Sequence, residues 1–257
     1  MMHLLRNARG MRVAIDAHDA SVRAWWAPDR YGRLADVLGV APPVARSSAG
    51  WRCASPDDGH LQLQLAQDGL SVHLTYRFDD DGSLQLDCVA TADTVSRFAL
   101  AAPRFNLQGR RAGVGDHVLR LAADRYWPWP GGSAGDAALD VAGSAFDFRQ
   151  PAPLASRLAW PALAHLPGFR HDFYWTGSGQ LREAARVVDP TSGRVLRFSS
   201  TQDSCHLYSD ARCFSLLAQG VDMQPGQVMR FTLAYRLGVQ DIDAFDISEP
   251  VSMMSNK

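Results

Sequence analysis

The stretch HLQLQLAQDGLSVHLTYRFDDDGSLQLDCVAT, residues 60–91, decides the fold class of this chain. Apolar and polar residues alternate in it three times, at 61–65, 72–78 and 84–90. Alternation with a period of two indicates a β-strand that buries one face. Turn residues separate the three runs, and a glycine in each turn can adopt the positive φ that a hairpin requires. The stretch therefore predicts a meander of three antiparallel strands.

The same alternation recurs outward toward both ends of the chain, at 11–15, 118–122, 195–198 and 228–237. Few windows favour a helix, and three prolines leave room only for a short turn at 151–166, since proline interrupts a helix interior. We predict one all-β domain over residues 1–238, a large antiparallel β-sandwich, followed by a polar C-terminal tail at 239–257.

Composition excludes several classes of partner. The 257 residues are 46% hydrophobic and 21% charged, with a formal net charge of −1. Such a balance supplies no long-range attraction for nucleic acid or for an anionic membrane surface. No apolar run reaches the ~18–20 residues that span a bilayer, and residues 1–10 lack the apolar core of a secretory signal. We expect a cytoplasmic protein without a nucleic-acid or membrane partner, whose oligomeric state the sequence leaves open.

The four cysteines, Cys53, Cys88, Cys205 and Cys213, do not form a C-x-x-C pair. The sequence therefore gives no support to a metal site or a thioredoxin-type redox site, and it predicts no cofactor. Cys88 and Cys205 lie within apolar strand patterns, so we expect buried, inert thiols there. A disulfide between Cys205 and Cys213 stays open, although a reducing cytosol disfavours it.

A series of short segments, in order along the chain, resembles the aldose 1-epimerase (galactose mutarotase) family. They are PDRYGR at 28–33 with DVLG at 36–39, FNLQG at 105–109, DH at 116–117 with ADRY at 123–126, VAGSAFDFR at 141–149, GFRHDF at 168–173, DPTSGRVL at 189–196 with STQ at 200–202, LY at 207–208, and PGQ at 225–227. The resemblance implies a galactose mutarotase-like supersandwich with an open sugar-binding cleft. It agrees with the strand pattern, which is independent of it.

The resemblance also implies which catalytic positions have changed. Mutarotases open a cyclic hemiacetal with a general acid and a general base, each of which contributes roughly 10²–10⁴-fold. The position of the family's acid histidine is Ala102 here, and that of its base glutamate is Leu217. An aspartate and a glutamine that orient the sugar are replaced by Arg170 and His206. The resemblance therefore implies a shortened, divergent member that has lost the usual acid/base pair, with no carboxylate and imidazole facing one another across the cleft.

Five residues remain as candidates for a site. Residues i and i+2 of a strand share a face, so Arg170 lies with Asp172 and His206 lies with Tyr208. We predict that Arg104, Arg170, Asp172 and Tyr208 bind the substrate, and that His206 is the catalytic candidate because histidine is the type of side chain suited to proton transfer near neutral pH. Two arginines favour an anionic ligand such as a sugar phosphate or a uronate. A surface ion pair between Arg170 and Asp172 and a structural role for His206 stay open.

Other motif residues are expected to be structural. His171 has the opposite parity to Arg170 and should pack away from the cleft. His117 belongs to a structural motif of the family, and Asp147 with Arg149 should form a local ion pair at a turn. The aromatic cluster at 126–130 either stacks on a sugar or packs in the core or at the rim.

Three functions follow. The first, favoured by the resemblance, is a carbohydrate-binding protein that recognises a sugar or an anionic sugar derivative. The second is an isomerase of the aldose 1-epimerase type with a site rebuilt from His206 and the arginines. The third is a non-catalytic protein that binds a partner where the cleft loops are shortened, at 40–50 and 219–226; an exposed apolar patch there would favour it.

Overall fold

The computed structural model describes residues 1–39, 50–57, 59–109, 113–127, 137–177, 179–218 and 220–240. Its strands form antiparallel sheets, which confirms the all-β prediction. Within the described residues the only helix is α1 (Leu154–Leu158), where the sequence predicts no more than a short turn. No helix among them is long and apolar enough to cross a membrane.

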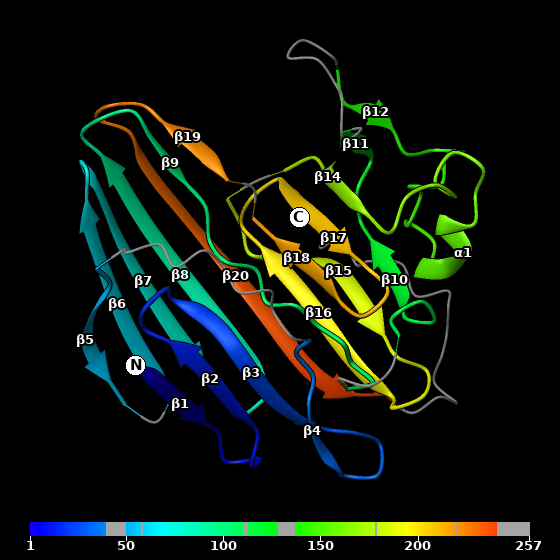
Figure 1. Ribbon diagram of the computed structural model, residues 1–257, viewed down its shortest axis with the longest axis horizontal. Helices are drawn as coiled ribbons and strands as arrows, with labels where there is room; N and C mark the ends of the chain where they lie inside the picture. Colours follow the sequence, from blue (N-terminus) through cyan, green and yellow to red (C-terminus); the bar gives the residue numbers. More distant parts are fainter. Residues whose placement is uncertain are drawn as a thin grey trace, which may run out of the picture.

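The largest sheet has nine strands and contains the predicted meander as β6, β7 and β8 (Figure 1). Its register pairs Leu61 with Tyr76 and Tyr76 with Leu86, so the apolar sets of the three strands share one face. In sheet order the strands are β13 (Ala152–Pro153), β10 (Val118–Leu121), β15 (Arg182–Val188), β16 (Arg194–Ser200), β20 (Val228–Val239), β8 (Ser83–Ala92), β7 (Leu70–Phe78), β6 (His60–Gln67) and β5 (Arg52–Pro56).

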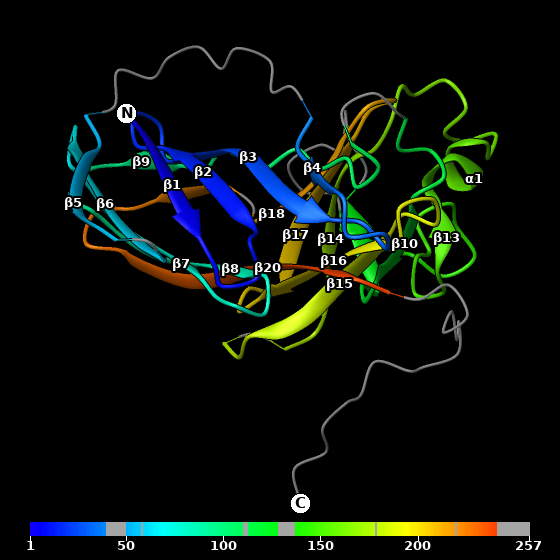
Figure 2. The ribbon, with the colours of Figure 1, turned by 90° about the horizontal axis from the view of Figure 1, so that it is seen from below.

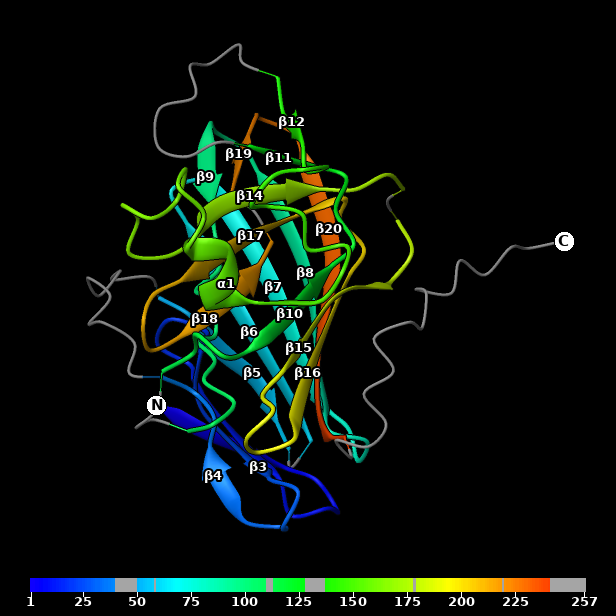
Figure 3. The same ribbon diagram turned by 90° about the vertical axis from the view of Figure 1, so that its right-hand side faces the viewer.

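Smaller sheets cover the apolar face of the large one. Figure 2 shows the four-stranded and five-stranded sheets on the same side of it, and Figure 3 shows α1 at the end that carries β10. The four-stranded sheet is β1 (Met2–Arg6), β2 (Arg12–Asp16), β3 (Ser21–Pro28) and β4 (Leu34–Asp36); the five-stranded sheet is β12 (Leu139–Asp140), β11 (Arg125–Trp127), β14 (Arg170–Tyr174), β17 (Ser204–Ser209) and β18 (Phe214–Leu217); a third pairs β19 (Val221–Met223) with β9 (Ser96–Phe98).

Aromatic side chains join these sheets into one core. Trp25 of β3 meets Phe78 of β7 edge-to-face, with ring centroids 5.8 Å apart. Phe105 contacts Trp25, Phe214 of β18 and Tyr235 of β20, at 6.1, 5.8 and 5.6 Å. Each such ring stabilises the fold by about 1.5–3 kcal/mol through burial. The five-stranded sheet is therefore held against the large sheet by its inner face, which leaves its other face for solvent.

Arg194 is buried where several segments that carry the family resemblance meet. Its guanidinium donates to the carbonyl oxygens of Ala27, Pro28, Arg33 and Leu107 at 3.3, 3.2, 3.1 and 2.8 Å. Burial lowers the pKa of Arg194, and its acceptors are neutral carbonyls rather than a direct carboxylate partner. Arg194 of the SGR segment therefore holds strand β3 and the turn after it against the loop that contains Leu107.

His117 belongs to the same region. Its Nε2 accepts the backbone N–H of Leu107 at 3.0 Å, and the side chain is buried. Burial lowers the pKa of His117 to about 4, although Asp189 and Asp116 act in the opposite direction. A neutral, buried imidazole that fixes a loop is a structural group, as the sequence predicts.

The remaining sequence predictions on the fold have mixed outcomes. β20 ends at Val239, one residue into the predicted tail, and residues 241–257 lie outside the described residues, as do 128–136. All four cysteines are free thiols: Cys88, Cys205 and Cys213 are buried, and Cys53 is exposed. Burial raises the pKa of Cys88 to about 12, so this thiol is inert.

Candidate functional site

The five candidate residues meet on the solvent-facing side of the five-stranded sheet. In β14, His171 and Phe173 are buried, whereas Arg170 is exposed and Asp172 is partly exposed. β17 shows the same alternation, with His206 and Tyr208 on the open side. We call this side the outer face.

Strand register arranges the outer face in two rows, because directly opposite residues of antiparallel strands share a side. The His206 row crosses β11, β14, β17 and β18 and contains Trp127, Asp172, His206 and Leu217. The Tyr208 row contains Arg170, Tyr208 and Ser215. Asp172 and His206 are therefore neighbours on adjacent strands. On the same face, Arg170 is two residues from Asp172 along β14, and Tyr208 is two residues from His206 along β17.

The segment that follows β9, at residues 103–105, adds Arg104 to the Tyr208 row. Phe105 and Phe214 exchange backbone hydrogen bonds at 2.7 and 2.9 Å, and the Ser215 hydroxyl donates to the carbonyl of Pro103 at 2.8 Å. These contacts hold Arg104 beside Ser215 at the edge of the outer face. Leu217, at the position that the resemblance assigns to the family's base, lies directly opposite His206.

Asp172 and His206 form a close polar pair. Oδ1 of Asp172 lies 2.6 Å from Nδ1 of His206, with side-chain exposures of 32% and 37%. In the neutral imidazole that donates from Nδ1, Nε2 is left as an acceptor for a ligand. The sequence predicts no carboxylate–imidazole pair across the cleft; the structure forms one within the sheet, between neighbouring strands. The alternative of an ion pair between Arg170 and Asp172 is wrong, since among the described residues Arg170 has no carboxylate partner.

Two arginines flank Tyr208. The guanidinium carbons of Arg104 and Arg170 lie 4.5 and 5.5 Å from the centroid of its ring, within cation–π range. The Tyr208 hydroxyl donates to Asp210 Oδ2 at 3.0 Å, and Nη1 of Arg104 lies 3.8 Å from the same oxygen. Asp210 thus partly neutralises Arg104, whereas the charge of Arg170 stays available.

Several donors stabilise the ionised form of Asp210. Partial burial acts to raise its pKa, but the backbone N–H groups of Arg212 and Cys213 and the hydroxyl of Tyr208 outweigh burial and lower it. Asp210 therefore stays negative and fixes the Tyr208 ring between the arginines. Asp210 is absent from the residues that the sequence predicts for the site, although its position two residues after Tyr208 was a usable signal.

His171 faces the other way and packs in an aromatic cluster. Its ring centroid lies 4.5, 6.2 and 6.5 Å from those of Phe146, Phe169 and Tyr126, and its Nδ1 accepts the backbone N–H of Arg170. Burial lowers the pKa of His171 to about 4; the neighbouring His206 acts in the same direction and Asp172 in the opposite one. His171 is a structural residue, as its parity predicts.

The aromatic cluster at 126–130 is divided between the two faces. Tyr126 points inward and stacks on Phe146 with centroids 4.0 Å apart, so Trp127 lies outward in the His206 row. Residues 128–130 lie outside the described residues. The predicted ion pair at the FDFR segment is present, with Arg149 Nη2 2.7 Å from Asp147 Oδ2.

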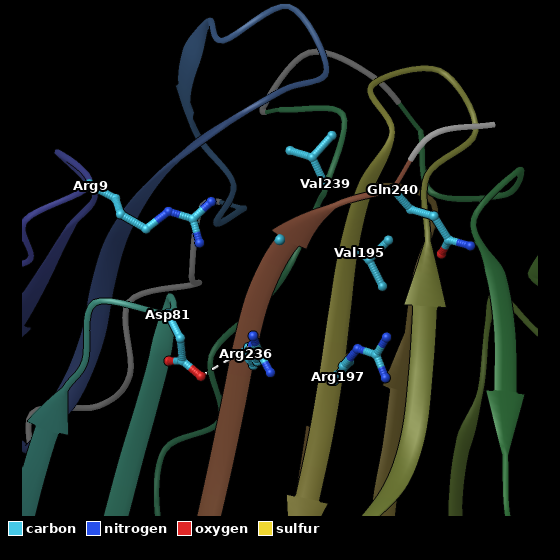
Figure 4. A pocket seen from close by; sticks show the side chains of 8 residues that line it. Arg9, Asp81, Val195, Arg197, Arg236, Val239 and Gln240 are labelled. Carbon is cyan, nitrogen blue, oxygen red and sulfur yellow. Dashed lines mark ion pairs between the residues drawn. The ribbon is translucent and has the colours of Figure 1, made fainter. Parts of the chain in front are cut away.

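A second candidate location lies on the large sheet where β16 begins and β20 ends (Figure 4). This pocket of about 270 Å³ is lined by Arg9, Asp81, Val195, Arg197, Arg236, Gly238, Val239 and Gln240. Arg236 is paired with Asp81 at 3.3 Å, and Arg197 with Glu183 at 2.9 Å. These two pairings weaken Arg236 and Arg197 as anion ligands and leave Arg9, which has no ion pair among the described residues, as the one arginine of the pocket open to an anion; none of the five candidates lies here. No group of side chains suited to a metal ion occurs in the part of the chain that the structure describes.

Comparisons with known proteins give matches to one family. The family model described as aldose 1-epimerase matches residues 65–229. Galactose mutarotase of Homo sapiens is 35% identical over 147 residues, which are 54% of this chain and 41% of the human protein. Aldose 1-epimerase of Escherichia coli is 28% identical over 171 residues, 62% of this chain and 49% of that protein. The chain thus spans less than half the length of the curated relatives that it matches.

Solved structures show the same fold. The GalM/aldose epimerase homologue from C. elegans superposes with a TM-score of 0.77 at 15% identity, covering 94% of this chain and 99% of that one. Galactose 1-epimerase from Lactobacillus acidophilus gives 0.65 at 17% identity, covering 93% and 94%. Because the family model covers more than half of the chain and the fold agrees, this protein belongs to the aldose 1-epimerase family.

Proposed function

We propose that this chain is a carbohydrate-binding protein whose ligand, a sugar or an anionic sugar derivative, occupies the outer face. The relatives named galactose mutarotase and aldose 1-epimerase support a sugar as the ligand. The observation that carries the proposal is the arrangement around Tyr208. Arg170, beside the Tyr208 ring, lacks a carboxylate partner among the described residues, and it lies two residues along β14 from Asp172 of the Asp172–His206 pair. Polar groups that converge beside an aromatic ring are typical of small-molecule sites.

Charge decides the class of sugar. Arginine presents a planar fork of donors that matches a carboxylate or a phosphate. Arg104 is already close to Asp210, so Arg170 is the group that an anion would meet. The site therefore suits a uronate or a sugar phosphate better than a neutral sugar.

Calorimetric titration tests this proposal. We expect saturable binding of galacturonate or galactose 6-phosphate, weaker binding of galactose, and a loss of about tenfold or more for the anionic sugars in Arg170→Ala. Arg97→Ala is the matched control, because Arg97 is an exposed arginine on β9, paired with Asp222 at 3.4 Å. Absence of binding by every sugar tested, or equal affinities in wild type and Arg170→Ala, would contradict the proposal.

The 2.6 Å contact between Asp172 and His206 favours a second candidate function, an isomerase with a rebuilt site. Asp172 would hold the proton on Nδ1, and Nε2 would accept the proton of the anomeric hydroxyl as the bond between C1 and the ring oxygen breaks. The imidazolium would return that proton to the ring oxygen, and closure on the other face of C1 would reverse the steps. No atom or electron is gained or lost, and no cofactor is needed. One such group contributes roughly 10²–10⁴-fold.

Mutarotation rates followed by polarimetry test the second function. His206→Ala should reduce the rate to that of the buffer, and Asp172→Asn should lower it by about tenfold or more by removing the orienting carboxylate. His73→Ala, a change of an exposed histidine on β7, is the control. If His206→Ala turned over as fast as wild type, this histidine would have no part in catalysis.

The partner-binding hypothesis gains no support from the described part of the shortened loops. Of residues 220–226, Met223 is buried and most of the others are exposed and polar or small. Residues 40–49 and Gln219 lie outside the described residues. We keep the cytoplasmic location and the single domain over 1–238 as parts of the proposal.

A further inference from the structure

We infer that Trp127 is the platform on which the ring of the sugar stacks, so that the outer face holds a ligand in two parts, the pyranose over the His206 row and its anionic group over the Tyr208 row. This inference rests on the proposed function and extends it to the orientation of the ligand. It assigns a specificity role to a residue on a strand that carries none of the five candidates.

Register places Trp127 beside the polar pair. Trp127 of β11 lies directly opposite Asp172 of β14. Asp172 in turn lies directly opposite His206 of β17. Its neighbour Tyr126 stacks inward on Phe146, so strand alternation sends the indole outward. The indole is partly exposed, which leaves aromatic surface for a ligand.

Spacing between strands fits one sugar ring. Neighbouring strands lie about 4.8 Å apart, so the backbones at Trp127 and His206 are separated by roughly 10 Å with Asp172 between them. A pyranose over Asp172 would meet the indole on one side and the imidazole on the other. The C–H groups of one sugar face pack on an aromatic face, while the hydroxyls at the ring edge need polar partners. The His206 row supplies both.

Spacing along the strands decides where the anion lies. Arg170 is two residues from Asp172, and Tyr208 is two from His206, so the two rows are roughly 7 Å apart. A carboxylate at C6 or a phosphate on O6 projects beyond the ring and can reach Arg170 while the ring stays over Asp172. A phosphate on the anomeric oxygen would instead cover the hydroxyl that faces His206. If the anomeric hydroxyl faces His206, as the second candidate function requires, the ligand is a hexose whose anion is at the C6 end and whose anomeric hydroxyl is free.

Calorimetry on single variants tests this inference with galactose, galacturonate, galactose 6-phosphate, galactose 1-phosphate and inorganic phosphate as probes. Trp127→Ala should weaken every pyranose that binds by about tenfold, neutral or charged, and should leave inorganic phosphate unaffected. Trp127→Phe should restore most of the affinity, because it keeps an aromatic face. Arg170→Ala should weaken only the anionic probes, and the 1-phosphate should bind no better than galactose.

The matched control is Trp160→Ala, since Trp160 is a partly exposed tryptophan that follows α1, far from β11 in sequence. Thermal melts establish that each variant is folded, and Trp127→Phe serves if Trp127→Ala does not fold. Unchanged sugar affinity in both Trp127 variants, or 1-phosphate binding equal to that of the 6-phosphate, would overturn this inference while the proposed function stood. If wild type bound no sugar, both would fall together.

Discussion

The two faces of the five-stranded sheet carry the same types of side chain with opposite outcomes. His171 and His206 lie on neighbouring strands, yet His171 is 3% exposed among aromatic rings and His206 is paired with a carboxylate in partial contact with water. The difference arises from parity alone, since His171 belongs to the inner set of β14 and His206 to the outer set of β17. On this sheet the inner face therefore contributes to the packed core, and the outer face carries the candidate site.

The largest effect should come from removing an inner ring. Phe173 is fully buried and lies 6.3 and 6.4 Å from Phe146 and Phe148, centroid to centroid. Phe173→Ala should lower the free energy of unfolding by about 3–5 kcal/mol through the cavity that it leaves. Arg170→Ala, three positions earlier on the outer face, should change it by less than about 0.5 kcal/mol. Urea unfolding measures both, and similar losses would break the contrast between the faces.

Acid should destabilise the fold through the inner histidines. Burial lowers the pKa of His117 and that of His171 to about 4, whereas an unfolded histidine titrates near 6.5. Between these values only the unfolded chain binds the protons, so stability is full above about pH 6.5 and is lost as the pH falls toward 4. Each histidine should contribute a loss on the order of 3 kcal/mol.

Urea midpoints from pH 7.5 to 4.5 measure this loss, and His171→Phe isolates one histidine. The variant loses the acceptor for the N–H of Arg170, so its absolute stability changes, but its stability should fall less steeply with acid than that of wild type. An identical slope in the variant would show that His171 titrates alike in the folded and unfolded chains.

A smaller effect is expected on the outer face at Tyr208. Tyr208→Phe removes the hydrogen bond to Asp210 but keeps the ring between the arginines, so it should cost about 0.5–1.5 kcal/mol. The pKa of Asp210 should rise, because one of the groups that lower it is lost. NMR titration of the Asp210 carboxyl follows this change. A fixed pKa would mean that the hydroxyl does not bond to Asp210 in solution.

The smallest effect is expected at the ion pair of Asp147 and Arg149. Their contact is short, but the side chains are 23% and 42% exposed, and water screens such pairs. Asp147→Asn should lower the free energy of unfolding by less than about 1 kcal/mol in urea melts. A loss of several kcal/mol would place this surface turn in the same class as the inner aromatic cluster.

Much of the fold followed from local pattern. The alternation at 60–91 predicted β6, β7 and β8, because a period of two reflects the pleat of a single strand. Parity separated Arg170 from His171, and the family resemblance pointed to the positions of His206 and Leu217. The pairing of Asp172 with His206 could not be predicted, since 34 residues separate them.

The sequence by itself determined the strands that have a clear alternation, which side of each of these is apolar, and the family resemblance that the comparisons confirm. Tertiary structure alone decided that Trp127, Asp172, His206 and Leu217 share one row. The physical reason is that a one-residue slip of register preserves the alternation along a strand but moves its side chains to the opposite face of the sheet. The inner side chains pack against the large sheet, where Phe105 joins Phe214 to Tyr235 of β20 and the Tyr235 hydroxyl donates to the carbonyl of Leu216. This packing selects one register, and that register places the outer groups.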